Sequence, residues 1–212
     1  MKKKVLIGNC FICGKTFTKT TMKNHIYKEH NSGDEKCYLI KAEGYYNKSY
    51  WLYSSISIHA NLTEVDDFLR DIWCECCQHL SAFTINNQEI SKKTKIVMFS
   101  LGEKVEYHYD FGSTTKIILT VIDEIFRLRQ REKICLIGRN VPEEFLCNHC
   151  GKPAVYCDCF GDAFFCEECK IKCNDEVYLL PITNSPRCGV CGYSGDYDKW
   201  DFKQKSFNSK EL

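Results

Sequence analysis

The feature that most constrains this chain is the spacing of the cysteines between Cys147 and Cys191, where nine of its 16 cysteines lie. Three pairs in this run have the spacing C-x-x-C, and one pair has the spacing C-x-C. A C-x-x-C turn lets two thiolates reach one tetrahedral ion, and a following glycine permits the backbone angles that the turn needs. The run therefore predicts structural zinc sites.

Disulfides are the alternative for a chain so rich in cysteine, and the redox compartment decides between the two. The sequence opens MKKKVLIGNC, without the apolar run of a signal peptide or a membrane span. We therefore expect a cytoplasmic protein with no membrane partner. Thiols stay reduced in that compartment, so the same cysteine spacing indicates metal binding. The net charge is only +1, but residues 1–30 carry seven lysines and one glutamate, which makes this segment basic.

This basic segment contains a second ligand pattern, C-x2-C-x11-H-x4-H. Phe17 and Met22 stand where a ββα finger needs its small apolar core. The segment resembles a C2H2 zinc finger whose ligands are Cys10, Cys13, His25 and His30. Two unrelated cysteines and two surface histidines are the alternative interpretation.

A finger of this sequence would carry base-reading and phosphate-binding side chains on or near its helix. By resemblance to DNA-binding fingers, the base-reading positions are Thr18, Thr21 and Asn24. The phosphate-binding positions are Lys15, Lys19, Lys23 and Lys28. We therefore expect DNA or RNA as a partner. The alternative is a finger that docks on its own protein or on another protein, with its lysines merely solvated.

The body of the chain, residues 37–141, has the pattern of a sheet. Segments 37–44 and 49–60 are rich in Tyr, Ile and Trp with partial alternation, which is typical of strands. Residues 104–121 alternate on both sides of a DFGS turn and predict a hairpin.

Between these strands, residues 63–80 have apolar side chains at helical spacing, behind a start at Thr63 and Asp66 that resembles a capping box. Adjacent residues on a helix point about 100° apart, so Cys76 and Cys77 could share an ion only if the helix ended there. Core packing is therefore the favoured role for the thiols, with a ligand or redox role as the alternative. The group in question is Cys74, Cys76, Cys77 and His79.

The order of these parts resembles the Ri-plasmid ORF-three-like family, often labelled transposon-passenger or TnpR-like, over residues 37–140. The matching positions are Trp73, His79, Leu80, Phe83, Tyr107, Tyr109, Asp110, Phe111 and Gly112. The family's polar continuation of the hairpin is replaced here by Ser113, Thr115 and Ile117. The resemblance implies an α+β fold without an established activity, in a zinc-bearing branch with an N-terminal C2H2-like finger.

The tail has more cysteines than two all-cysteine sites need, so its ligand pairing stays open. The order of the pairs favours one ion bound by Cys147, Cys150, Cys166 and Cys169. A second ion would use Cys157 and Cys159 with two of Cys173, Cys188 and Cys191, and the choice between Cys173 and Cys188 is left undecided.

The sequence thus predicts an α+β fold: an antiparallel sheet with helices at residues 37–141, a ββα finger at 1–32 and a Cys-rich zinc module at 142–212. Zinc would be structural, because the sequence patterns of catalytic zinc are missing. The leading function is a zinc-binding protein that binds nucleic acid or regulates through its basic finger. The alternative is a zinc-stabilised protein-interaction adaptor. An enzyme ranks third, because no nucleophile, base and oxyanion donor can be assembled.

Overall fold

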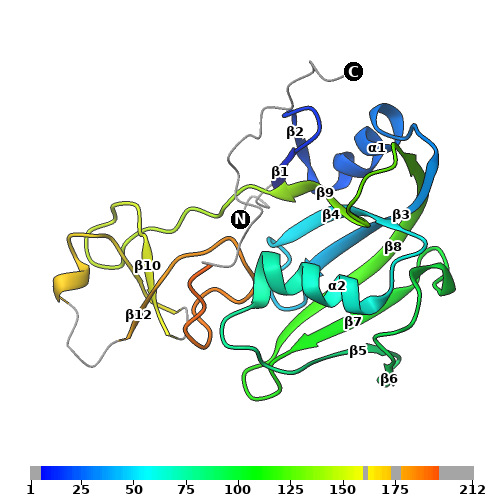
Figure 1. Ribbon diagram of the computed structural model, residues 1–212. Helices are drawn as coiled ribbons and strands as arrows, with labels where there is room; N and C mark the ends of the chain where they lie inside the picture. The colour runs from blue at the N-terminus through cyan, green and yellow to red at the C-terminus, as the bar shows by residue number, and fades with distance from the viewer. Residues whose placement is uncertain (1–5, 160–161, 173–177, 196–212) are drawn as a thin grey trace.

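The computed structural model describes residues 6–159, 162–172 and 178–195 of the 212-residue chain. The predicted mixed α+β class with an antiparallel sheet is confirmed. In the described part, nine strands form the main sheet and three short strands form a second sheet in the tail (Figure 1). None of the described helices is long and apolar enough to cross a membrane.

The main sheet has the strand order β2-β1-β9-β4-β3-β8-β7-β5-β6, and its neighbouring strands are antiparallel. Its strands are β1 (Ile7–Cys10), β2 (Thr16–Thr18), β3 (Glu35–Gly44), β4 (Trp51–Ser57), β5 (Ser81–Ile85), β6 (Gln88–Ile90), β7 (Lys104–Tyr109), β8 (Thr115–Arg127) and β9 (Ile134–Asn140). The helical elements of this part are α1 (Lys19–Glu29), α2 (Leu62–Leu69), the π-helical turn η1 (Arg70–Cys74) and the 3-10 turn η2 (Ile96–Met98). The tail contains β10 (Tyr156–Asp158), β11 (Phe164–Phe165), the 3-10 turn η3 (Lys170–Lys172) and β12 (Leu179–Pro181).

Helix α2 begins earlier and ends earlier than its sequence pattern predicts. Its N-cap is Asn61 rather than Thr63, because the Asn61 side chain accepts from the backbone N–H of Thr63 and of Glu64. The Glu64 carboxylate in turn accepts from the backbone N–H of Asn61 at 2.9 Å, which completes a capping box. The helical segment ends with η1 at Cys74, and Glu75 is already extended. The residues after Glu75 therefore leave the helix axis.

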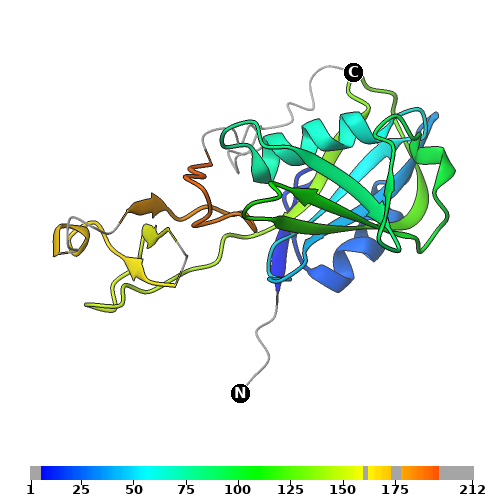
Figure 2. The ribbon, with the colours of Figure 1, turned by 90° about the horizontal axis from the view of Figure 1, so that it is seen from below.

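The main sheet is covered on both faces, which is why β4 is buried along its whole length. On one face, Leu52 packs in a cluster with the apolar residues of α2. On the other face, Trp51 packs with Met22 and Ile26 of α1. Figure 2 shows the sheet lying between α2, in cyan to green, and α1, in blue. Alternating residues of one strand thus serve two separate cores.

The segment that resembles a finger continues the main sheet, because β1 pairs with β9. Two glycines permit this close approach. A Cβ atom at Gly8 would lie 2.3 Å from the carbonyl oxygen of Arg139, and one at Gly138 would lie 3.0 Å from the Met22 side chain. The boundary predicted between residues 1–32 and 37–141 is therefore crossed by sheet hydrogen bonds, and the two parts share a core.

A buried polar network ties α2 to the sheet. The Asp66 carboxylate accepts from the Tyr107 hydroxyl and the Ser81 hydroxyl, each at 2.7 Å, and from the Lys92 ammonium group at 2.8 Å. Burial raises the pKa of the Asp66 carboxyl, but these three donors and the nearby Arg70 outweigh burial and hold the pKa below its usual value of 3.8. The carboxylate therefore stays ionised inside the protein.

Tyr107→Phe removes the hydroxyl that donates to the Asp66 carboxylate. The free energy of unfolding should fall by about 1.5–3 kcal/mol at pH 7, because a buried hydrogen bond to a charged group is lost. Since the folded-state pKa of Asp66 is depressed, bonds to its carboxylate contribute above pH 3.8 and are lost as pH falls through the folded-state pKa. Urea denaturation at several pH values should show that the difference in free energy of unfolding between Tyr107→Phe and the intact protein becomes smaller in acid. Tyr27→Phe, at an exposed position, is the control and should change little. A difference that stays constant in acid would contradict this assignment.

Candidate metal centres

Within the described residues, three groups of four Cys and His donor atoms each lie within 4.8 Å of one another. The first group is Cys10, Cys13, His25 and His30; the second is Cys147, Cys150, Cys166 and Cys169; and the third is Cys76, Cys77, His79 and Cys191. Tetrahedral zinc with Zn–S of about 2.3 Å and Zn–N of about 2.0 Å places neighbouring donors about 3.3–3.8 Å apart. The groups can be compared with that geometry.

The first group is held by β1, β2 and α1, which follow one another in ββα order. Cys13 Sγ lies 3.2 Å from His25 Nε2, and Cys10 Sγ lies 3.5 Å from His30 Nε2. The two Nε2 atoms are 3.1 Å apart. Burial lowers the pKa of both imidazoles, which favours the neutral form that binds metal. These distances are close to the separations between donor atoms in a tetrahedral zinc site.

The second group lies in the tail, away from the main sheet. Cys150 Sγ and Cys166 Sγ are 3.6 Å apart, and the other two donors complete the group. Burial raises the pKa of the Cys147 thiol, but backbone N–H donors, that of Cys166 first, outweigh it and lower the pKa to about 6. A thiolate, which is the form that binds metal, is therefore favoured at neutral pH.

The first two groups share one turn, C-x-x-C-G-K, and the same backbone hydrogen bonds. The first cysteine donates its N–H to the lysine carbonyl, from Cys10 to Lys15 at 2.9 Å and from Cys147 to Lys152 at 2.7 Å. The glycine of the turn has a φ of 72° in one case and 70° in the other. This is the backbone region that glycine adopts without steric cost. Two segments far apart in the sequence thus fold into the same ligand-presenting turn.

The remaining tail cysteines, from which the second site was predicted, lie in separate places. Cys157 Sγ lies 3.9 Å from Cys188 Sγ, so Cys188 is the partner of Cys157 in the described structure. Cys159 belongs to none of the three groups. Cys173 lies outside the described residues. Of the combinations left open for the second site, those that include Cys191 are not formed among the described residues, since Cys191 lies in another group. The combination of Cys157 and Cys159 with Cys173 and Cys188 stays a prediction.

The third group contains three residues for which a ligand role was the alternative interpretation, but the participation of Cys191 was not predicted. It joins Cys191 to three residues that follow α2, namely Cys76, Cys77 and His79. The core packing predicted for these thiols is right for Cys74, which is fully buried, and wrong for Cys77, which is exposed. The signal in the sequence was the CCQH stretch, but its meaning depended on the helix ending before it. Because the helix ends at Cys74, the following donors can converge.

Several side chains predicted to contact nucleic acid have partners inside the protein. Lys19 forms an ion pair with Glu43, and Lys23 Nζ lies 3.6 Å from a carboxylate oxygen of Asp123. Thr18 and Thr21 form the capping box of α1. Thr21 nevertheless remains exposed, as do the other predicted positions Lys15, Asn24 and Lys28. Four of the seven predicted residues are thus exposed, and three of them lie on α1.

No arrangement of a nucleophile and a base is found among the described residues around Asp66. The Ser81 hydroxyl lies 2.7 Å from Lys92 Nζ, the spacing of a serine–lysine pair. However, Lys92 Nζ also donates to the Asp66 carboxylate at 2.8 Å, so it is engaged in a partly buried ion pair. Ser81 itself donates to Asp66, so its hydroxyl is not directed at an open site. The network links α2 to β5 and β7 through Asp66.

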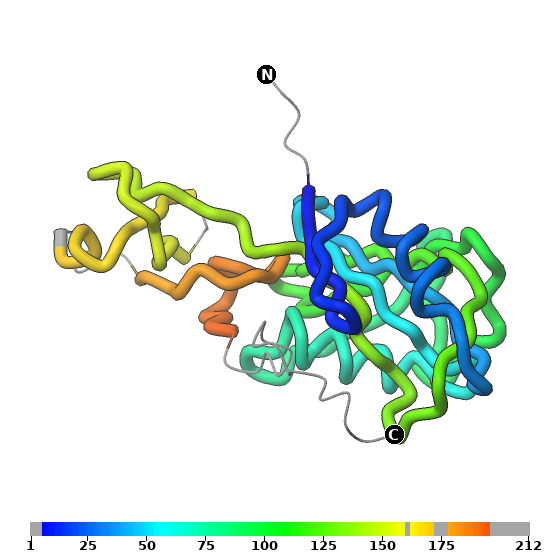
Figure 3. Tube along the Cα trace, turned by 90° about the horizontal axis from the view of Figure 1, so that it is seen from above, coloured from blue at the N-terminus to red at the C-terminus, as the bar shows by residue number. Residues whose placement is uncertain are grey.

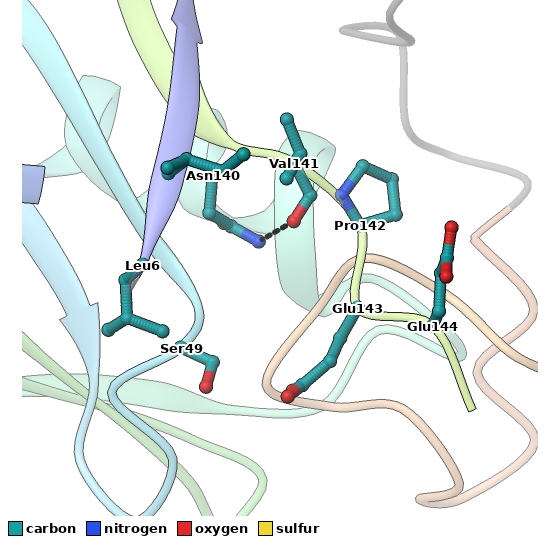
Figure 4. Close-up of a pocket in the computed structure, with 8 residues that line it drawn as sticks. Leu6, Ser49, Asn140, Val141, Pro142, Glu143 and Glu144 are labelled. Carbon is teal, nitrogen blue, oxygen red and sulfur yellow. Dashed lines mark hydrogen bonds between the residues drawn. The ribbon is translucent and has the colours of Figure 1, made fainter. Parts of the chain in front are cut away.

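A cavity of about 260 Å³ lies where β9 leaves the main sheet for the tail (Figure 4). Its lining residues are Leu6, Ile7, Ser49, Asn140, Val141, Pro142, Glu143 and Glu144. The Asn140 amide donates to the carbonyl of Val141 at 3.0 Å and to the side chain of Asn184 at 2.7 Å. The lining contains no cysteine or histidine, so the cavity is separate from the metal centres.

Comparisons with known proteins leave the function open. No protein-family model matches the chain, and no curated protein matches it. A crystal structure of a protein of unknown function from Methanosarcina mazei Go1 is 16% identical over a region covering 57% of this chain and 77% of that one, with a TM-score of 0.43. A similarity at this level supports no conclusion about function.

Proposed function

We propose that this is a zinc-binding protein in which zinc is structural. The observation that carries the proposal is the repeated C-x-x-C-G-K turn, which brings Cys10 and Cys147, each with three further ligands, into groups of tetrahedral size. Each group offers four Cys or His donors, which is the ligand number of a closed structural site. Zinc would supply folding energy to short segments that bury little apolar surface of their own. In the cytoplasm, the compartment we propose, the thiols would stay reduced.

We further propose that the exposed face of α1 binds nucleic acid. Thr21, Asn24 and Lys28 lie three and four residues apart, so they share one face of the helix, and all three are exposed. Lys15 is exposed in the turn before β2. The opposite face of α1 packs on the sheet through Met22 and Ile26. The face with Thr21, Asn24 and Lys28 is therefore directed toward solvent. A helix face that is held in place by its buried side and carries polar side chains beside two exposed lysines is suited to contact phosphates and base edges.

The experiment is a salt titration of DNA and RNA binding by fluorescence anisotropy, with bound zinc counted in the same samples. Lys15→Ala/Lys28→Ala should reduce the slope of log K against log salt by about 2, because each phosphate contact contributes about 0.9 on duplex DNA. Lys93→Ala/Lys104→Ala, which removes two exposed lysines from other elements, should leave the slope unchanged. Zinc content should be equal in all three proteins.

Absence of salt-dependent binding by the intact protein would overturn the nucleic-acid proposal and favour a protein-interaction adaptor. Absence of bound zinc in the intact protein would overturn the zinc proposal. The two results are independent of each other.

Membership of the Ri-plasmid ORF-three-like family is also proposed, and the positions of four of the nine matching residues support it, whereas Leu80 and Phe111 are exposed. Trp73, Tyr107 and Tyr109 are fully buried, and Asp110 is 5% exposed. Residues that a family shares for its fold are expected in such positions. The test is a solved structure of an authentic member, in which the strand order β9-β4-β3-β8-β7-β5 must recur.

A further inference from the structure

We propose that Cys76, Cys77, His79 and Cys191 form a third zinc site, the clasp, which fastens residues 184–193 of the tail to the body. This site goes beyond the two structural centres proposed above and does not depend on them. Its ligands come from two segments that lie more than 100 positions apart in the sequence, since Cys77 and Cys191 are separated by 114. A metal ion bound here would therefore act as a cross-link between the body and the tail.

The distances in the clasp fit one ion. Cys76 Sγ and Cys77 Sγ are 3.6 Å apart, and Cys77 Sγ and Cys191 Sγ are 3.9 Å apart. His79 Nε2 lies 3.0 Å from Cys77 Sγ and 3.2 Å from Cys191 Sγ. A tetrahedral Cys3His site has donor separations of about 3.5–3.8 Å. The donor set is also one of the common sets for structural zinc.

The backbone around the clasp adopts unusual angles that turn the ligands toward one point. Gln78, between Cys77 and His79, has a φ of 63°, and Cys191 has a φ of 51°. Non-glycine residues adopt such values at a cost of about 1 kcal/mol or more, so the surroundings must favour them. In both places the left-handed residue lies at or beside a ligand. Convergence of the donors on an ion accounts for both turns.

The tail segment meets the body through buried contacts next to the clasp, so the two segments are already positioned for a shared ion. The Trp73 indole donates to the Asn184 carbonyl at 3.1 Å, and the Ser185 hydroxyl donates to the Trp73 carbonyl at 2.6 Å. The Arg187 guanidinium, fully buried, forms an ion pair with Asp110 at 2.7 Å. Figure 3 shows the orange segment returning to the body while the yellow part of the tail extends away from it.

Exposure distinguishes the clasp from the other two groups. Cys77 and Cys191 are both exposed, whereas the tail group has three buried cysteines and the finger group has two buried ligands. A chelator or a thiol reagent reaches exposed ligands first. The clasp should therefore release its ion before the other groups do, and the tail segment would then be held by its buried contacts alone.

The test compares Cys77→Ser, Cys191→Ser and the double variant with the intact chain, using Cys135→Ser as a control outside all three groups. Zinc is counted after purification, and hydrogen exchange is measured by mass spectrometry. Each single variant and the double variant should bind one zinc fewer than the intact chain. All three should also lose amide protection in residues 184–193. The control should match the intact chain.

Two outcomes would overturn the clasp. Unchanged zinc content in both single variants would show that no ion binds at the clasp. The zinc still bound would then be that of the two structural centres, whose proposal would stand. A double variant that loses two ions would show that Cys77 and Cys191 serve different sites. Graded chelation followed by iodoacetamide should modify Cys77 and Cys191 before Cys10 and Cys147; the reverse order would overturn the proposed release order.

Discussion

Cys13→Ser is expected to remove one zinc ion and to destabilise the body as well as the finger segment. Without its ion the finger segment should unfold, because segments of this size depend on zinc for folding. Met22 and Ile26, both fully buried, would then leave the core that they share with Trp51. At about 1.5–3 kcal/mol for each buried side chain, the body should lose about 3–6 kcal/mol. The melting temperature should fall by about 6–24 °C.

The matched control for this prediction is Cys150→Ser, which removes a ligand of the same kind from the tail group. The cluster around that group contains only cysteines of the tail, so the body should keep its stability. Thermal unfolding followed by tryptophan fluorescence, with zinc counted in parallel, separates the two cases. If the body melts at the same temperature in Cys13→Ser as in the intact protein, residues 1–32 form an independent module.

The second large effect is expected from Asp110→Asn, which removes the charge that pairs with Arg187. Arg187 is fully buried and donates to Asp110, to the Thr115 hydroxyl and to the Ser113 carbonyl. Loss of one partner of a buried ion pair leaves an uncompensated charge and costs about 3–5 kcal/mol. Asparagine tolerates the positive φ of 65° at this position, so the turn itself should persist.

Urea denaturation in the presence of excess zinc measures this cost. Asp123→Asn is the matched control, because Asp123 pairs with Lys23 at 3.6 Å on the surface, where an ion pair contributes about 0–1 kcal/mol. Asp110→Asn/Arg187→Met should recover part of the loss, since both charges are then absent. A cost for Asp110→Asn no larger than that of Asp123→Asn would show that the buried pair does not hold the tail to the body.

The sequence alone determined the features that depend on neighbouring residues. The C-x-x-C-G-K turns are local, because two ligands and a left-handed glycine lie within six residues, and the structure contains both turns at Cys10 and Cys147. The alternation of β7 likewise follows from side chains at every second position, which are buried in turn. The mixed α+β class follows from these patterns.

The ends of elements were less well determined. Helical periodicity continues past Cys74, but the chain turns at Glu75, whose carboxylate accepts from the Arg70 guanidinium at 2.8 Å and from the backbone N–H of Gln78. Apolar spacing does not record such contacts. The periodicity therefore placed Cys76 and Cys77 on a helix face, whereas they are ligand candidates on a bent, non-helical segment.

Only the tertiary structure decided which distant segments meet. The pairing of β1 with β9 joins residues about 130 positions apart, and it requires small residues on both strands, at Gly8 and Gly138. Cys188 lies next to Cys157, whereas Cys191 lies next to Cys77. This division depends on the return of the tail to the body. Spacing along the chain limits which donors can share an ion within one turn. It does not limit which segments fold together, because that choice depends on how apolar side chains from distant segments are buried against one another.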